Sequence, residues 1–159
     1  MSVKNRKSVF RGRYTCKLNP KGRLSLPAAF RDKMNTEDST LIITNNLSQN
    51  RKCLDVYTLD QWEKLESQVI HMSSLNPNVQ NYQRFYISGG QEINVDSQHR
   101  VLIPMSLREY AQLDQGIVVV GLGQKFEIWS ENIWNEFFQQ LQSGFDGTVA
   151  AVAGLMNAG

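Results

Sequence analysis

The residues with the clearest chemical potential are basic side chains in two short turns of equal spacing. The first turn reads Asn19-Pro20-Lys21-Gly22-Arg23, and the second reads Asp96-Ser97-Gln98-His99-Arg100. A guanidinium can bind a phosphate, or the O6/N7 edge of guanine, through two hydrogen bonds, and an ammonium is a point charge suited to a phosphate. The turns therefore indicate contact with nucleic acid, led by Arg23 and Lys21.

A turn arginine has a second, purely structural use, which is to pair with a carboxylate of the same turn. Asp96 can hold Arg100 in this way, whereas Asn19 cannot form an ion pair with Arg23. The first turn also has Gly22, which lets a backbone approach closely, where the second has His99, so the geometry of the second turn stays open. We therefore hypothesise that the first turn dominates DNA affinity and that the second serves mainly the fold or the assembly.

The charge of the chain is concentrated around the first turn. Residues 1–35 contain ten Lys or Arg and one acid, whereas the remainder contains seven basic and fourteen acidic residues, which the net charge of +2 conceals. Clustered cations favour a nucleic-acid face, although residues 1–8 are equally typical of a solvated basic tail, and residues 1–9 are expected to be mobile. Arg11, Arg13 and Lys17 precede the turn on a patterned strand, and we expect them to extend a track of phosphate contacts.

Both turns belong to a repeat with an offset of 77 residues. Each turn is followed by a short apolar strand and a proline, Pro27 or Pro104, which can open a short helix. Each proline is followed four residues later by an arginine, Arg31 or Arg108, expected to cap the C-terminal end of that helix or to pair with another subunit.

The repeat divides the chain into two related units. We expect a first unit at 10–62 with a helix at 58–72, a connecting helix at 73–90, a second unit at 91–142 and a Gly/Ala tail at 143–159. Strands are predicted at 40–44 and 53–57, joined by a long polar loop, and the tail is expected to be frayed. Units of this size bury little core alone, so the two are expected to share one.

The paired turns, the Phe10-Arg11-Gly12 start and the tandem units resemble the MraZ family, a branch of the AbrB-like swapped-hairpin proteins. The Asp-x-x-x-Arg signature of that family is present as Asp96 and Arg100, while Asn19 departs from it in the first copy. The resemblance implies an α+β fold with a mainly β core, in which two AbrB/MraZ-like units form a pseudo-symmetric, interlocked swapped-hairpin β-barrel with peripheral helices.

The resemblance also implies a function. It predicts a cytoplasmic, nucleoid-associated transcriptional regulator that binds double-stranded DNA at promoter direct repeats of the cell-division and cell-wall gene cluster. It would act as a homo-oligomeric ring, usually as a repressor. The predicted DNA-binding residues are Arg23, Lys21, Gly22, Arg13, Arg11, Lys17 and Arg100, and the predicted turn-structuring residues are Asn19, Asp96, Pro27 and Pro104.

Other functions have weaker support in the sequence. No phosphate loop, nucleophile elbow or paired-carboxylate signature indicates an enzyme, and His71 and His99 lack partners at metal-ligand spacing. We therefore expect no catalysis, cofactor, metal or small-molecule substrate, and no membrane span, since no apolar run reaches about 18 residues. Cys16 and Cys53 are expected to be reduced thiols. The alternatives are an antitoxin-like protein-binding module and RNA binding, which the turns disfavour because they lack interleaved aromatics.

Overall fold

The computed structural model describes residues 9–31, 34 and 40–158. The basic tail at 1–8 lies outside the described residues, as do residues 32–33, where we expect the short helix after Pro27 to end. In chain order the elements are β1 (Arg13–Lys17), β2 (Arg23–Ser25), α1 (Ala28–Arg31), β3 (Thr40–Ser48), β4 (Arg51–Thr58), α2 (Leu59–Ile70), α3 (Pro77–Tyr82), the π-helical turn η2 (Gln83–Ile87), β5 (Gln91–Asn94), β6 (Arg100–Leu102), α4 (Met105–Tyr110), β7 (Gly116–Gly121), β8 (Lys125–Ser130), α5 (Glu131–Ser143) and α6 (Phe145–Ala158).

The two halves of the chain exchange strands. A six-stranded antiparallel sheet has the order β1-β7-β8-β4-β3-β5, and β2 pairs with β6 in a separate two-stranded sheet. Thus β1 of the first half pairs with β7 of the second, and β5 of the second half pairs with β3 of the first. The result is a mixed fold with a mainly antiparallel core. Among the described residues this sheet is open, with β1 and β5 at its edges, and closure into a barrel stays a prediction.

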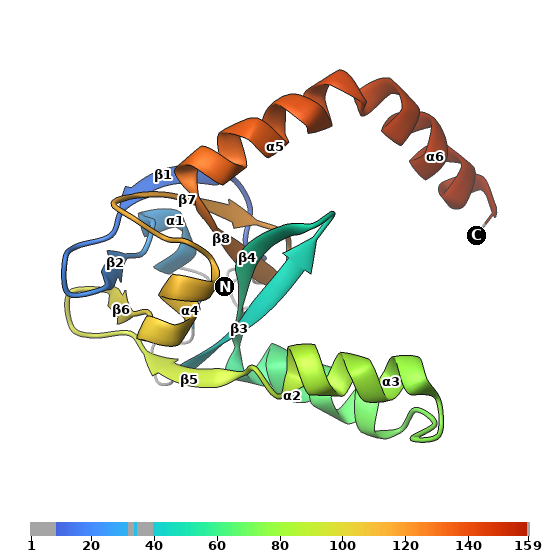
Figure 1. Cartoon of the computed structure of the whole chain (residues 1–159), viewed down its shortest axis with the longest axis horizontal. Helices are drawn as coiled ribbons and strands as arrows, with labels where there is room; N and C mark the ends of the chain where they lie inside the picture. The colour runs from blue at the N-terminus through green and yellow to red at the C-terminus, as the bar shows by residue number, and fades with distance from the viewer. Residues whose placement is uncertain (1–8, 32–33, 35–39, 159) are drawn as a thin grey trace, which may run out of the picture.

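The main core lies on one face of the six-stranded sheet and draws on both halves. Phe10, Phe30 and Phe126 meet there, with ring centroids 5.0–5.1 Å apart, beside the buried Leu24 and Val101 of the two-stranded sheet. The opposite face of the large sheet is covered by helices (Figure 1). Trp62 of α2 and Trp134 of α5 are 4% and 9% exposed and belong to separate buried clusters on that face.

The polar run between β3 and β4 differs from its sequence prediction. The expected loop at 45–52 is wrong, because both strands continue through it and pair as far as Ser48 opposite Arg51. Only Gln49 and Asn50 form the turn, with φ of 50° and 65°. Two residues of positive φ give a turn whose twist matches that of the flanking strands, so the hairpin can extend beyond its apolar part.

The helix starts follow local capping chemistry. Thr58 Oγ1 accepts a hydrogen bond from the Gln61 backbone N–H at 3.3 Å and so caps α2. Asn76 caps α3 through its Oδ1, and Pro77 occupies the first turn of that helix, where no N–H is needed. No helix among the described residues combines the length and apolar character that crossing a membrane requires.

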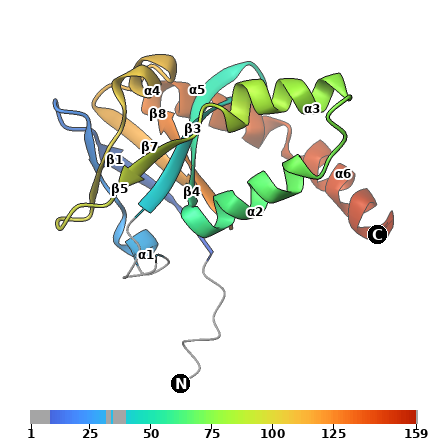
Figure 2. The same cartoon turned by 90° about the horizontal axis from the view of Figure 1, so that it is seen from below.

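The C-terminal tail is helical, so the expectation of a frayed tail is wrong. Helix α6 leads away from the rest of the fold (Figures 1 and 2), and each of its residues is exposed. Its alanines and leucine favour helix, whereas Gly147 and Gly154 disfavour it. The exposed side chains include the apolar Phe145, Val149 and Leu155.

Because α6 buries no side chain, we expect a chain that ends at Gly144 to unfold with nearly the same free energy as the full chain. The difference should be below about 0.5 kcal/mol, as for changes at exposed sites in general. Urea denaturation of both chains, followed by tryptophan fluorescence, measures it. A loss of more than about 1 kcal/mol would show that α6 supports the fold in a way its exposure does not suggest.

Candidate nucleic-acid interface

The two basic turns have the same backbone geometry. In the first, the Asn19 N–H donates to Arg23 O and the Gly22 N–H donates to Asn19 O, both at 2.9 Å. In the second, the Asp96 N–H donates to Arg100 O and the His99 N–H donates to Asp96 O, also both at 2.9 Å. Gly22 has φ +86° and His99 has φ +61°, so histidine takes the left-handed conformation that the turn requires.

The first residue of each turn stabilises it in the same way. Asn19 Oδ1 accepts from the backbone N–H groups of Lys21 and Arg23, at 3.0 and 2.9 Å. Asp96 Oδ1 accepts from the corresponding groups of the second turn, at 2.9 Å each. An amide oxygen therefore replaces the carboxylate oxygen in the turn without loss of a backbone hydrogen bond.

The two turns differ in the second polar side-chain atom of their first residue. Arg100 Nε donates to Asp96 Oδ2 at 3.0 Å, so this guanidinium is held within its own turn. The backbone N–H of Arg100, chiefly, and its guanidinium lower the pKa of the Asp96 carboxyl below its usual value. The second polar atom of the Asn19 side chain is its amide nitrogen, which cannot accept a hydrogen bond from Arg23. The first arginine therefore stays unrestrained by its turn, as the sequence suggests.

The pairing of β2 with β6 brings both arginines to one face. Arg23 lies opposite Leu102, and Arg100 lies opposite Ser25. Because side chains alternate along a strand, these four share one side of the two-stranded sheet, while Leu24 and Val101 on the other side are buried. Arg23 and Arg100 are half-exposed diagonal neighbours, a position with a Cα separation of about 7–8 Å.

Each turn is also tied to the opposite half of the chain. The Ile103 N–H donates to Gly22 O at 2.9 Å, and the Leu26 N–H donates to His99 O at 3.0 Å. Both turns lie at the end of the molecule opposite to the α2–α3 pair and α6, at the left of Figures 1 and 2. The strand exchange therefore places the two basic turns on one end of the fold.

The arginines after the prolines reinforce this arrangement. Arg31 Nε donates to Leu26 O at 3.1 Å and Arg108 Nε donates to Ile103 O at 2.9 Å, so each side chain reaches back to the residue before its proline. This differs from the expected capping of the helix C-termini, and pairing with another subunit stays a prediction. The carbonyls of Pro27 and Pro104 accept the first hydrogen bonds of α1 and α4.

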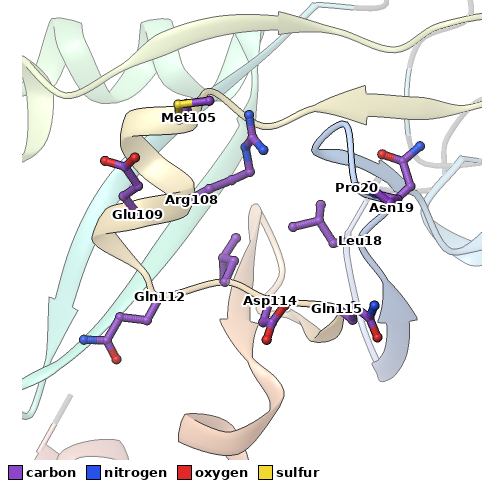
Figure 3. A pocket seen from close by; sticks show the side chains of 10 residues that line it. Leu18, Asn19, Pro20, Met105, Arg108, Glu109, Gln112, Asp114 and Gln115 are labelled. Atoms are coloured by element: carbon purple, nitrogen blue, oxygen red, sulfur yellow. The ribbon is translucent and has the colours of Figure 1, made fainter.

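The Arg108 side chain lies against the first turn and limits what can replace Gly22. It lines a pocket between that turn and α4, together with Asn19 and Pro20 (Figure 3). A Cβ added at Gly22 would lie 2.5 Å from Arg108 Cζ. Gly123 has the same φ of +86°, but a Cβ there would meet no atom within 4 Å. The two glycines form a matched pair for separating backbone strain from contact.

We expect Gly22→Ala to destabilise the fold more than Gly123→Ala. Both should lose about 1–2 kcal/mol from the left-handed backbone. Gly22→Ala must also displace Arg108 from Ile103 O, which adds about 0.5–1.5 kcal/mol for the lost hydrogen bond. Urea denaturation of the two variants measures the difference. Equal losses would mean that Arg108 moves aside without cost.

The remaining predicted DNA-binding residues are distributed unevenly. Lys21 is exposed in the first turn, and Arg11 and Lys17 are exposed on the segment that leads to it. Arg13 is also exposed, but its guanidinium lies 4.5 Å from the centre of the Phe138 ring of α5. A cation–π contact there directs Arg13 toward the helix-covered face rather than toward Arg23.

A second charged cluster, which the sequence did not predict, lies on the helix-covered face of the large sheet. Asp55 is fully buried, and its Oδ2 accepts from Lys125 Nζ at 2.7 Å, from Asn46 Nδ2 at 3.1 Å and from the Tyr86 hydroxyl. Burial opposes the charge of Lys125, but the Asp55 carboxylate outweighs it and raises the Lys125 pKa. Strand pairing assembles this cluster from distant residues, so no spacing motif could reveal it.

Comparisons with known proteins agree with this architecture. A family described as "MraZ protein, putative antitoxin-like" matches residues 9–85 and again 86–152, so the family pattern occurs twice in the chain.

Three relatives named "Transcriptional regulator MraZ" are each 37% identical to this chain. The protein from Acidithiobacillus ferrooxidans aligns over 142 residues, 87% of this chain and 94% of its own. The proteins from Desulfitobacterium hafniense and Solidesulfovibrio magneticus align over 151 and 147 residues, covering 95% and 91% of this chain and 99% and 95% of their own. A solution structure from Pyrococcus horikoshii, 14% identical over 75% of this chain and 87% of its own, has a TM-score of 0.35, too low to inform the fold. The family predicted from the paired turns is confirmed: the chain belongs to the MraZ family.

Proposed function

We propose that this protein is a transcriptional regulator that binds double-stranded DNA through the exposed face of β2 and β6 and the two turns that precede these strands. The observation that carries the proposal is the convergence of Arg23 and Arg100 on one exposed face at the end of the molecule. The names of the relatives support the regulatory part of the proposal.

The chemistry of the face suits the major groove. A two-stranded β-ribbon fits that groove, and an arginine at its edge can bind guanine O6 and N7 together. Arg23 has this role, because no carboxylate of its own turn competes for its guanidinium. Lys21 contacts a phosphate, Gly22 lets the turn backbone approach the duplex, and Lys17 and Arg11 extend the phosphate contacts.

One protomer offers few cations, so a single copy binds weakly. We propose that protomers assemble into a ring and bind direct repeats in the promoter of the cell-division and cell-wall gene cluster, as a repressor associated with the nucleoid. Linked copies raise the effective concentration at neighbouring repeats and so increase overall affinity without any new type of contact. The interlocked halves are proposed to close into a swapped-hairpin barrel that holds both turns rigidly.

The test is footprinting of the purified full-length protein on the DNA upstream of its own gene, with the mass of the assembly measured in the same buffer. We expect protection of regularly spaced repeats by an oligomer, with an affinity that falls steeply as salt rises. Uniform, unspaced protection at all protein concentrations would contradict sequence-specific binding. A monomer that protects the repeats equally well would contradict the avidity argument.

The second candidate is an antitoxin-like protein-binding module. It is favoured by the description of the matching family and by α6, which buries no side chain and exposes the apolar Phe145, Val149 and Leu155. Co-purification with a small protein at fixed stoichiometry, lost when the chain is ended at Gly144, would support this candidate. Retention of that partner by the shortened chain would exclude α6 as the binding element.

A further inference from the structure

Three potential metal-ligating side chains meet on the helix-covered face of the large sheet. Cys53 and Asp55 are two residues apart on β4 and so project from the same face of the sheet, and Glu127 of β8 is the cross-strand partner of Asp55. One ligand atom from each of the three residues lies within 4.8 Å of the others. Cys53 and Asp55 are fully buried, and Glu127 is half-buried.

The hydrogen bonds of the carboxylates leave one oxygen of each available. Asp55 Oδ2 accepts all three of the cluster's donors, from Asn46, Tyr86 and Lys125, whereas Asp55 Oδ1 is buried and has no hydrogen-bond partner. Glu127 Oε1 accepts from Trp129 Nε1 at 2.9 Å, which leaves its other oxygen for a further contact. A buried carboxylate oxygen without a partner is costly, so Oδ1 requires an explanation.

From this geometry we propose that Cys53, Asp55 and Glu127 form a binding site for one divalent cation of the Zn²⁺ class. A thiolate together with carboxylates suits Zn²⁺ or Co²⁺ rather than the harder Mg²⁺ or Ca²⁺, which take oxygen ligands alone. Tetrahedral Zn²⁺, with bonds of about 2.0–2.3 Å, holds its ligand atoms about 3.5 Å apart. Side-chain adjustments on the order of 1 Å close the site, and a water completes the coordination.

The surroundings of the three side chains match those of a metal centre. Lys125, Tyr86 and Asn46 fix the Asp55 carboxylate through Oδ2, as outer-shell partners orient ligands in metal sites. The apolar cluster that contains Cys53, with Trp129 and Phe137, excludes water on one side.

The test uses reduced, untagged full-length protein without DNA, so that its outcome does not depend on the proposed function. Co²⁺ serves as the probe, because a thiolate ligand gives a charge-transfer band in the near ultraviolet. We expect one Co²⁺ per chain with this band, displaced by Zn²⁺. Cys53→Ser should abolish the band, and Glu127→Gln, which keeps an acceptor for Trp129, should weaken Co²⁺ binding at least about tenfold.

Cys16→Ser is the matched control, because Cys16 is the other thiol of the chain and lies on β1, away from the cluster. This variant should retain the band and the affinity of the unmodified protein. The proposal is overturned if the folded protein shows no band with excess Co²⁺, if the band survives Cys53→Ser, or if Glu127→Gln binds Co²⁺ as tightly as the unmodified chain. Circular dichroism confirms that each variant remains folded, so that loss of binding reports on the ligands.

Discussion

We expect Arg23→Ala to weaken binding to a duplex with one promoter repeat by about ten- to a hundredfold, and Arg100→Ala to weaken it by less than about threefold. A bidentate arginine–guanine contact contributes about 1–3 kcal/mol, and each 1.4 kcal/mol corresponds to about a factor of ten. Arg23 is free to make this contact, whereas Arg100 is already bound to Asp96 Oδ2 at 3.0 Å. Fluorescence anisotropy titrations of the two variants measure the difference.

Each of the two variants is the control for the other, because both arginines are half-exposed and stand at the start of paired strands. The thermal midpoints of both variants should stay close to that of the unmodified protein. If Arg23 instead contacts a phosphate, its removal should lower the log–log salt slope by about 0.9 and weaken all duplexes alike. Equal or reversed losses for Arg23→Ala and Arg100→Ala would contradict the division of roles between the turns.

A second large effect is expected at the buried charge cluster. We expect Asp55→Ala to lower the free energy of unfolding by about 3–5 kcal/mol, because breaking a buried ion pair leaves the remaining charge uncompensated. Lys125 Nζ would lose its partner at 2.7 Å, and Asn46 and Tyr86 would lose their common acceptor. Urea denaturation in the presence of a chelator, which keeps cations out of the cluster, measures the loss.

Asp60→Ala provides the comparison for Asp55→Ala. Asp60 forms an ion pair with Lys64 at 3.3 Å, but the two side chains are 77% and 64% exposed, so its loss should cost less than about 1 kcal/mol. Replacing both partners, as in Asp55→Leu with Lys125→Met, should recover part of the stability lost in Asp55→Leu alone. Similar losses for Asp55→Ala and Asp60→Ala would show that the buried pair contributes little.

The repeat in the sequence predicted the structural features that depend on residues close to one another in the chain. The turns, the short strands after them and the helix starts at Thr58 and Asn76 follow from residue type and spacing, and the structure contains each of them. The different restraint of Arg23 and Arg100 could also be predicted, since it depends on whether Asn or Asp stands four residues earlier. The family could be predicted because two turns shared one register.

What the sequence did not predict depends on partners distant in the chain. The polar end of the β3–β4 hairpin is a strand because its neighbour pairs with it, although Asn, Ser and Gln are typical of loops. The arrangement of Cys53, Asp55 and Glu127 requires the register of β4 against β8. Arg13 appeared equivalent to Arg11 and Lys17, yet Phe138, 125 residues later, attracts its guanidinium.

The exchange of strands between the halves has a consequence for how the two turns can change. Two identical chains related by a two-fold axis would carry two identical turns, so any substitution would alter both sites at once. When both halves belong to one chain, this symmetry is not required, so a substitution can change one turn and leave the other unchanged. The Asn at 19 and the Asp at 96 are such a divergence. A DNA site bound in the way proposed above would therefore not need to be palindromic, so the proposed tandem sites could all point in one direction.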